Sequence, residues 1–182
     1  MTEVVFETHS LSEDNEAGIA SGWSHSRLSV RGRELARQLG ERRRSDGIAA
    51  VFASDLRRAA ETAHIAFAET TIPVFLDWRL RECDFGERNA GPADRHVRDR
   101  QDFLDVPYPG GESWRQAVAR VGCFLGDLPT PLEGDQTADH RPRGHSLGVR
   151  TSPCGQAPRG SDQRRLPLEG RVGIHPRRPA AA

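Results

Sequence analysis

Short apolar runs alternate with longer amphipathic stretches along the first 137 residues of the chain. The runs are EVVFE (3–7), IAAVFAS (48–54) and IPVFL (72–76), and their β-branched and aromatic residues are typical of strands. When strands alternate with helices, consecutive strands usually lie parallel in one sheet. The pattern therefore predicts an α/β domain with a mostly parallel sheet that is flanked by helices.

Helical periodicity fills the spaces between these runs. Leu35 and Leu39 lie one helical turn apart, and Ser54 stands where it could cap a following alanine-rich helix. The clearest periodicity spans residues 112–128, where apolar side chains recur every three or four positions. They are Trp114, Ala117, Val118, Val121, Leu125 and Leu128. This stripe predicts a helix packed on the core, in which Trp114 is a core residue rather than a cofactor contact.

Charge and composition divide the chain near residue 137. Residues 1–137 carry 17 Arg against 23 Asp and Glu, a net charge of −6, whereas residues 138–182 carry 9 Arg against 3 acidic residues, a net charge of +6. The second segment has no aromatic residue and contains six prolines, so it buries too little apolar surface to offset the entropy lost on folding. We expect one domain over residues 1–137, followed by a disordered Arg/Pro/Gly-rich tail over residues 138–182.

The composition also limits the classes of function. The chain contains no run of about 20 apolar residues and no basic, apolar leader, so we expect a cytoplasmic protein with no membrane partner. The tail's arginines lack interleaved aromatic residues and helical periodicity, which argues against a nucleic-acid partner. The three cysteines, Cys83, Cys123 and Cys154, form no CxxC pair, so no zinc site is predicted. The oligomeric state is left open by the sequence.

His9 is the first candidate for chemistry because it closes the first apolar run. A histidine that follows a buried strand is held at the edge of a sheet, where it can act as a nucleophile or contact a phosphate. The alternative is an ordinary hydrogen-bonded histidine, which occurs more often.

Two later segments add groups that are suited to a phosphate. In ASDLRRAAETA (53–63), Arg58 falls in the first turn of the predicted helix, where the helix dipole and the guanidinium group both attract an anion. Arg57 is expected to face water. In RLRECDFGE (79–87), Glu82 follows the third predicted strand after a short loop. A carboxyl group beside a phosphate can act as a general acid, although most loop glutamates are merely solvated.

Together these segments resemble the histidine phosphatase superfamily, which has the phosphoglycerate mutase-like fold. The resemblance covers residues 4–137 and rests on His9, on Asn15 six positions later and on five blocks in the family's order. The blocks are SGW (21–23), LSVRG (28–32), SDLRRAAETA (54–63), LRECDFGE (80–87) and PGGES (109–113). The resemblance implies a three-layer α/β sandwich with a mostly parallel sheet flanked by helices, whose C-terminal part is incomplete in this chain.

By this resemblance, the protein is a phosphatase that hydrolyses small phosphomonoesters through a phosphohistidine on His9. Glu82 would be the general acid, and Arg58, Asn15 and Ser10 would bind the phosphate of a small phosphorylated substrate, with no cofactor and no metal. Hydrolysis is favoured over a mutase reaction because no further phosphate-handling insertion is evident between the blocks at 80–87 and 109–113. The alternative is a non-catalytic or inactive protein with the phosphoglycerate mutase-like fold.

Departures from the family pattern support that alternative. Thr8 and Ser10 flank His9 where the family has Arg and Gly, and the loss of one charged donor to a developing oxyanion costs on the order of 3 kcal/mol. The family also has a second histidine, in a Gly-His pair that ends an apolar strand. The Gly-His pair ending at His145 follows charged residues and a proline, so no buried strand is predicted to deliver it.

The tail is compatible with a shifted reading frame. The codons of ADHRP (138–142) and the next residue, read one base later, permit LIIGH, an apolar strand that ends in Gly-His. The same shift applied to PLEGRVGIH (167–175) permits HWKDGWEY, an aromatic-rich close that related sequences carry. We hypothesise that the chain after Thr137 is translated out of frame.

Overall fold

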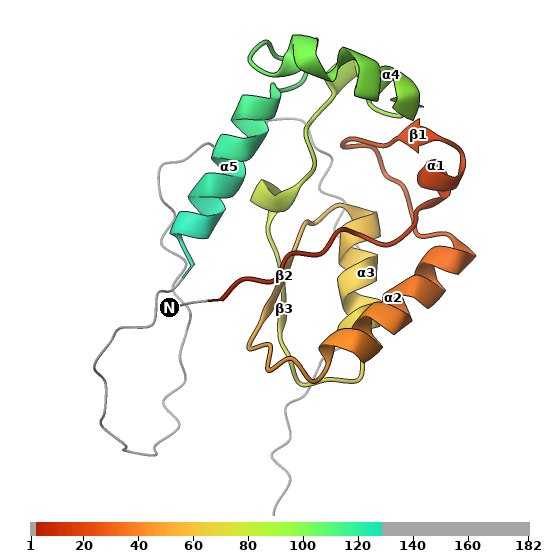
Figure 1. Cartoon of the computed structure of the whole chain (residues 1–182), viewed down its shortest axis with the longest axis vertical. Helices are drawn as coiled ribbons and strands as arrows, with labels where there is room; N and C mark the ends of the chain where they lie inside the picture. The colour runs from red at the N-terminus through yellow and green to blue at the C-terminus, as the bar shows by residue number, and fades with distance from the viewer. Residues whose placement is uncertain (1–2, 129–182) are drawn as a thin grey trace, which may run out of the picture.

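The computed structural model describes residues 3–128, in which helices cover both faces of a short parallel sheet (Figure 1). The sheet consists of β2 (Val51–Ala53) and β3 (Val74–Leu76). Helices α2 (Val30–Arg43) and α3 (Arg57–Phe67) lie side by side on one face, and α5 (Trp114–Gly126) lies on the other side of the strands. The described chain is therefore layered as helices, sheet and helix.

The strands alternate their side chains between the two helical layers. Val51 packs against the buried cluster that contains Leu39 of α2 and Phe67 of α3. The next residue, Phe52, turns to the other face, where its ring centroid lies 5.4 Å from that of Phe124 in α5. Since consecutive strand residues point to opposite faces, this alternation holds the two helical layers apart. The strands predicted from the second and third apolar runs, and their parallel pairing, are confirmed in shorter form.

Helices α2 and α3 approach closely because a glycine lies where they touch. A Cβ on Gly40 would lie 2.0 Å from the carbonyl oxygen of Ala66, so no larger residue fits without moving the helices apart. Ala36, one turn before Gly40, is completely buried. The helix predicted from Leu35 and Leu39 is thus confirmed, with Leu39 in the core and Leu35 at 37% exposure.

Helix α3 begins without the predicted cap. Its N-cap residue is Leu56, whose side chain accepts no hydrogen bond. Ser54 lies two residues earlier, and its hydroxyl oxygen accepts from the backbone N–H of Leu56 at 3.2 Å. Ser54 therefore closes the turn between β2 and α3, and the prediction that it caps the helix is wrong. The chain uses these extra residues to turn from the strand into the helix, which still leaves Arg58 in the first helical turn.

Helix α5 is confirmed, but its buried face differs from the predicted stripe. Its buried residues are Ala117, Arg120 and Phe124, at spacings of three and four. Val118 and Leu125, which the stripe places in the core, are 68% and 47% exposed. Arg120 occupies the core-facing side because its guanidinium group donates to acceptors there. Hydrophobic periodicity cannot predict a buried charged residue of this kind.

Shorter elements complete the described part of the chain. They are α1 (Glu13–Glu16), β1 (Ile19–Ala20), η1 (Trp78–Leu80), η2 (Gly86–Arg88), β4 (Gly91–Pro92), α4 (Ala93–Asp99) and η3 (Arg100–Phe103), where η denotes a 3₁₀ helix. Strands β1 and β4 pair antiparallel beside α1 and α4, in the upper part of Figure 1. A buried cluster of Cys83, Phe85, Tyr108 and Ala117 joins this region to α5.

Residues 3–9 do not form the strand predicted from EVVFE. Val4, Val5 and Phe6 make no ladder with any described strand and are 59%, 48% and 83% exposed. A strand is stable only when a neighbouring strand takes up its backbone groups, and neither β2 nor β3 pairs with this segment. The described residues therefore contain two sheets of two strands each, and the predicted extended, mostly parallel sheet is not confirmed.

Some expectations fall on other parts of the chain. The tail at 138–182, His145 and the shifted reading frame lie outside the described residues. Within residues 3–128, no helix combines the length and the apolar character needed to cross a membrane.

Burial predicts opposite outcomes for two phenylalanines. Phe85 is 2% exposed and its ring packs against those of His96 and Tyr108, so Phe85→Ala should lower the free energy of unfolding by about 3–5 kcal/mol. Phe6 is 83% exposed, so Phe6→Ala should change it by no more than about 0.5 kcal/mol. Urea unfolding followed by tryptophan fluorescence measures both. Similar losses in the two variants would contradict the burial described for them.

Candidate active site

Two hydrogen bonds hold His9 in one neutral tautomer. Its Nδ1 lies 2.7 Å from the carbonyl oxygen of Ser10, and because a carbonyl can only accept, Nδ1 carries the proton. Its Nε2 lies 3.1 Å from Nε of Arg58, and because a guanidinium can only donate, Nε2 accepts. The lone pair of the imidazole is therefore on Nε2, which is the atom that could attack an electrophile.

The surroundings keep His9 uncharged. Burial has the largest effect and lowers the pKa of His9 below its ordinary value of 6.5, and the charge of Arg58 lowers it further. The hydrogen bond to Ser10 and the charge of Glu82 act in the opposite direction. The neutral imidazole, which is the nucleophilic form, is thus favoured near neutral pH.

Arg58 is almost completely buried and connects the parts of the site. It is 1% exposed, and burial lowers its pKa while Glu82 acts against that shift. Nη2 donates to the carbonyl oxygen of Gly22 and to Oε2 of Glu82, both at 2.8 Å. Nη1 donates to the carbonyl oxygen of Ser24 at 3.4 Å, and Nε donates to His9. A buried cation is tolerated when its donors are paired, so these acceptors fix its position.

A loop after β1 presents two of these carbonyl groups because it contains Gly22. Gly22 has a φ of +53°, and a Cβ there would lie 1.9 Å from Oδ1 of Asn89, so only glycine fits. The same Oδ1 accepts from the backbone N–H groups of Trp23 and Phe85, at 3.1 and 3.0 Å. The Asn89 side chain therefore ties this loop to the segment that carries Glu82.

Glu82 reaches the site from the segment between η1 and η2. Its side chain is 39% exposed although its partner Arg58 is buried. One carboxylate oxygen is bound to the guanidinium group, and the partial exposure leaves the carboxyl group accessible to a bound molecule. His9, Arg58 and Glu82 thus form one hydrogen-bonded chain, as their sequence segments led us to expect.

The two other predicted phosphate ligands are engaged elsewhere. The hydroxyl of Ser10 donates to the carbonyl oxygen of Gly32 at 2.8 Å, and its backbone N–H donates to Oγ1 of Thr62 at 2.9 Å. Asn15 forms a capping box with Ser12 at the start of α1, in which Oδ1 of Asn15 accepts from the backbone N–H of Ser12 at 3.1 Å. Both residues lie near His9 in sequence. In the structure, the Ser10 hydroxyl and Oδ1 of Asn15 each form a hydrogen bond with a backbone group.

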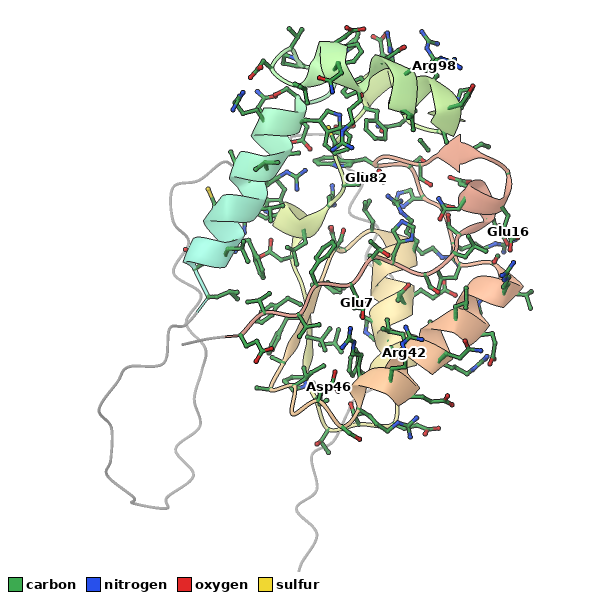
Figure 2. All side chains as sticks on the ribbon, viewed as in Figure 1. Glu7, Glu16, Arg42, Asp46, Glu82 and Arg98 are labelled. Atoms are coloured by element: carbon green, nitrogen blue, oxygen red, sulfur yellow. The ribbon has the colours of Figure 1, made fainter. Side chains whose placement is uncertain are left out.

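A cavity of about 150 Å³ opens beside His9. It is lined by Glu7, Thr8, His9, Ser10, Leu35, Leu39 and Arg42. Arg58 and Glu82 are not among its lining residues, and Figure 2 shows Glu82 well above Glu7 and Arg42. The cavity therefore lies between α2 and the segment 7–10, and His9 both lines it and contacts Arg58.

A cysteine also lies near the site: Cys83 follows Glu82 in the chain. Burial raises the pKa of the Cys83 thiol to about 12, and the nearby charge of Glu112 adds to the effect. The protonated thiol donates to the carbonyl oxygen of Glu112 at 3.7 Å. Because the thiolate is the reactive form, Cys83 does not compete with His9. Among residues 3–128, no three metal-binding side chains gather in one place.

Several residues that build the site were not among those predicted from the sequence. Gly22 and Trp23 lie in the SGW block, which we noted only for its resemblance to a family. Thr62 lies one turn after Arg58 in α3 and accepts from the backbone of Ser10 while donating to the carbonyl oxygen of Arg58 at 2.7 Å. Thr62 could have been found from its position four residues after Arg58, which places the two side chains on the same face of α3. A glycine that needs a positive φ leaves no comparable signal in a single sequence.

Comparison with known proteins identifies the class. The profile of the histidine phosphatase superfamily (branch 1) matches residues 5–138, and the chain belongs to this superfamily. The probable phosphoglycerate mutase GpmB of Enterobacter sp. (strain 638) is 31% identical over 144 residues, which are 75% of this chain and 67% of that protein. The protein of the same name from Salmonella typhi is 32% identical over 133 residues, 69% of this chain and 62% of that protein.

Solved structures give the same result for the fold. Bacillus stearothermophilus YhfR matches with a TM-score of 0.59 and 28% identity, covering 69% of this chain and 66% of that one. A mycobacterial glucosyl-3-phosphoglycerate phosphatase, solved in complex with VO3, matches with a TM-score of 0.57 and 26% identity, covering 66% of each chain. This chain thus spans about two thirds of the length of its relatives. The predicted phosphoglycerate mutase-like family is confirmed.

The lowered pKa of His9 predicts that the folded chain loses stability on acidification. Because the unfolded chain takes up a proton on His9 at a higher pH, near 6.5, than the folded chain does, the contribution of His9 is complete above that value and is lost as the pH falls through the lower folded value. Between about pH 8 and about pH 5, the wild-type protein should lose more unfolding free energy than His9→Asn.

Denaturant unfolding of the two proteins at several pH values measures this difference. Above about pH 7.5 the unfolding free energies of the two proteins should change with pH in the same way, because His9 is neutral there in both the folded and the unfolded chain. Parallel behaviour over the whole range would show that the folded chain does not disfavour the charged imidazole.

Proposed function

We propose that the protein hydrolyses small phosphomonoesters through a phosphohistidine on His9. The observation that carries the proposal is the neutral tautomer of His9, which presents the lone pair of Nε2 beside a buried cation and a carboxyl group. Membership of the histidine phosphatase superfamily supports the same chemistry. Relatives are named as a glucosyl-3-phosphoglycerate phosphatase and a probable phosphoglycerate mutase, and these names support a phosphorylated substrate.

In the first step, Nε2 of His9 attacks phosphorus and the bond from phosphorus to the ester oxygen breaks. Glu82, whose carboxylate is paired with Arg58 in the resting site, takes the proton of the bound monoester monoanion and gives it to the departing oxygen, so the alcohol leaves neutral and the phosphoryl group stays on Nε2. Arg58 balances the charge on the phosphoryl oxygens through its guanidinium group. Nδ1 keeps its proton throughout, because the carbonyl of Ser10 holds it.

In the second step, water attacks the phosphorus of phosphohistidine. The Glu82 carboxylate takes a proton from this water, the bond between phosphorus and Nε2 breaks, and inorganic phosphate leaves. Glu82 passes this proton to the departing phosphate and is a carboxylate again, and His9 returns to its neutral tautomer, so the cycle is closed.

The resting geometry adds a condition on substrate binding. The Nε–H group of Arg58 lies on the lone pair of Nε2, so His9 cannot attack until that bond is broken. A phosphoryl oxygen is a stronger acceptor than a neutral imidazole because it is charged. Binding of the substrate therefore turns the donor of Arg58 toward the phosphate and frees the nucleophile.

The alternative is a relative that keeps the fold without catalysis. Thr8 lines the cavity beside His9 and has no charge, in the position where the family pattern has a guanidinium group. The Arg58 contact that covers Nε2 would then be permanent rather than displaced by substrate.

A turnover assay on His9 separates these two functions. Wild-type protein should release phosphate from p-nitrophenyl phosphate, and His9→Asn should fall to background because the variant lacks the imidazole that accepts the phosphoryl group. Rapid quenching and mass spectrometry should find an acid-labile phosphate on the peptide that contains His9. His64→Asn is the matched control, since His64 is an exposed residue of α3, and it should keep the wild-type rate. Equal, background turnover in wild type and His9→Asn would favour the non-catalytic alternative.

Restoring a cation beside His9 should increase the rate. Thr8→Arg adds a charged donor next to the nucleophile and should raise kcat/KM for p-nitrophenyl phosphate by up to about a hundredfold. Thr71→Arg adds the same charge at an exposed position and should leave kcat/KM unchanged. An equal rise in both variants would mean that the added charge acts only through general attraction of the substrate.

A further inference from the structure

The backbone of the segment that carries Glu82 is held by side chains from two distant parts of the chain. We propose that Arg120 of α5 and Trp23 of the loop after β1 are positioning residues, which fix Glu82 where it can deliver its proton. This inference rests on the proposed function, in which Glu82 is the proton donor. It assigns to α5 a part in catalysis although α5 contributes no group to the reacting atoms.

Arg120 donates hydrogen bonds to three backbone carbonyl groups of the segment that carries Glu82. Nη1 donates to the carbonyl oxygens of Arg79 at 2.8 Å and Arg81 at 2.9 Å, and Nη2 donates to that of Glu82 at 3.2 Å. The three acceptors span the end of η1 and the residue that would transfer the proton. Helix α5 lies beside η1, which Figure 1 shows next to it in yellow-green. One side chain thus sets the path of the chain into Glu82.

A second contact fixes Arg120 itself. Its Nε and Nη2 face the two carboxylate oxygens of Glu112, so the pair is bidentate. Arg120 is 8% exposed, and a buried guanidinium with this many acceptors has little freedom to move. A lysine at 120 could keep the charge, but its single ammonium group cannot reach three carbonyls and a carboxylate in this planar arrangement.

Trp23 reaches the same point from the opposite end of the described chain. Its Nε1–H donates to the carbonyl oxygen of Glu82 at 2.7 Å. The guanidinium carbons of Arg81 and Arg120 lie 4.6 and 5.8 Å from the centre of its indole ring, within the range of cation–π attraction. The carbonyl oxygen of Glu82 therefore accepts from two donors, while its carboxylate is held by Arg58.

These contacts matter to catalysis because proton transfer depends steeply on placement. The carboxyl group has to lie within hydrogen-bond reach of the departing oxygen, and its side chain is partly exposed, so only its backbone and Arg58 restrict it. Loosening the backbone should reduce the rate for substrates that need the proton. Substrates whose leaving group departs without a proton should be affected much less.

Leaving-group dependence tests this inference. Trp23→Phe removes the indole N–H and keeps an aromatic ring. It should lower kcat for an alkyl phosphate by about tenfold or more while changing kcat for p-nitrophenyl phosphate by less than about twofold. Arg120→Lys should show the same selectivity, and KM should change little in both variants.

Two controls separate positioning from a general loss of structure. Trp114→Phe makes the same change at a partly buried indole that is not one of the two donors to the carbonyl oxygen of Glu82, and it should leave both rates unchanged. Phe67→Leu weakens the distant cluster around α2 and α3, and any loss should be equal for the two substrates. Equal losses for the two substrates in Trp23→Phe, or no loss for either, would overturn the inference.

Hydrogen exchange supplies a readout that does not need turnover. Backbone amides in residues 79–84 should exchange faster in Trp23→Phe and Arg120→Lys than in wild type, whereas those of α3 should be unchanged. If wild type shows no turnover, the proposed function fails, but faster exchange at 79–84 would still support the positioning. Unchanged exchange at 79–84 in Trp23→Phe would overturn it whatever the turnover.

Discussion

The guanidinium group of Arg58 cannot give up its charge, and at 1% exposure it cannot be hydrated. The protein therefore has to supply acceptors, and they come from chain positions that are far apart: His9, Gly22, Ser24 and Glu82. Each acceptor draws its own segment toward α3. The start of the chain, the loop after β1 and the segment after β3 meet because one buried charge requires all of them.

Sequence patterns predicted the parts of the fold that depend on local periodicity. Strands β2 and β3 and helices α2 and α5 lie where apolar runs and helical repeats placed them. Two predictions failed because each depended on a distant partner that composition and periodicity do not report. Residues 3–7 have the composition of a strand, yet a strand also needs a partner, and composition does not report whether one is available. On α5, Arg120 is buried because it donates hydrogen bonds to backbone carbonyl groups there, and a hydrophobic pattern does not predict such bonds.

The sequence predicted those residues of the candidate site that stand at the ends of predicted strands or at the start of a predicted helix. His9, Arg58 and Glu82 stand at the ends of successive elements, and the structure joins them by hydrogen bonds. Asn15 and Ser10 were assigned to phosphate by resemblance alone, and that assignment stays a prediction: the hydroxyl of Ser10 donates to the carbonyl oxygen of Gly32, and Oδ1 of Asn15 accepts from the backbone N–H of Ser12. Trp23 could not be found from spacing, because its contact with Glu82 links residues 59 positions apart.

The exposed apolar residues at the beginning of the chain have a consequence for handling the protein. Val4, Val5 and Phe6 form an extended stretch that makes no ladder within the described residues, and such stretches recruit identical strands from other molecules. Glu3 and Glu7 flank them, and charges in these places oppose stacking of like chains. Preparations kept at low ionic strength should therefore stay dispersed, whereas high salt, which screens these charges, should favour association.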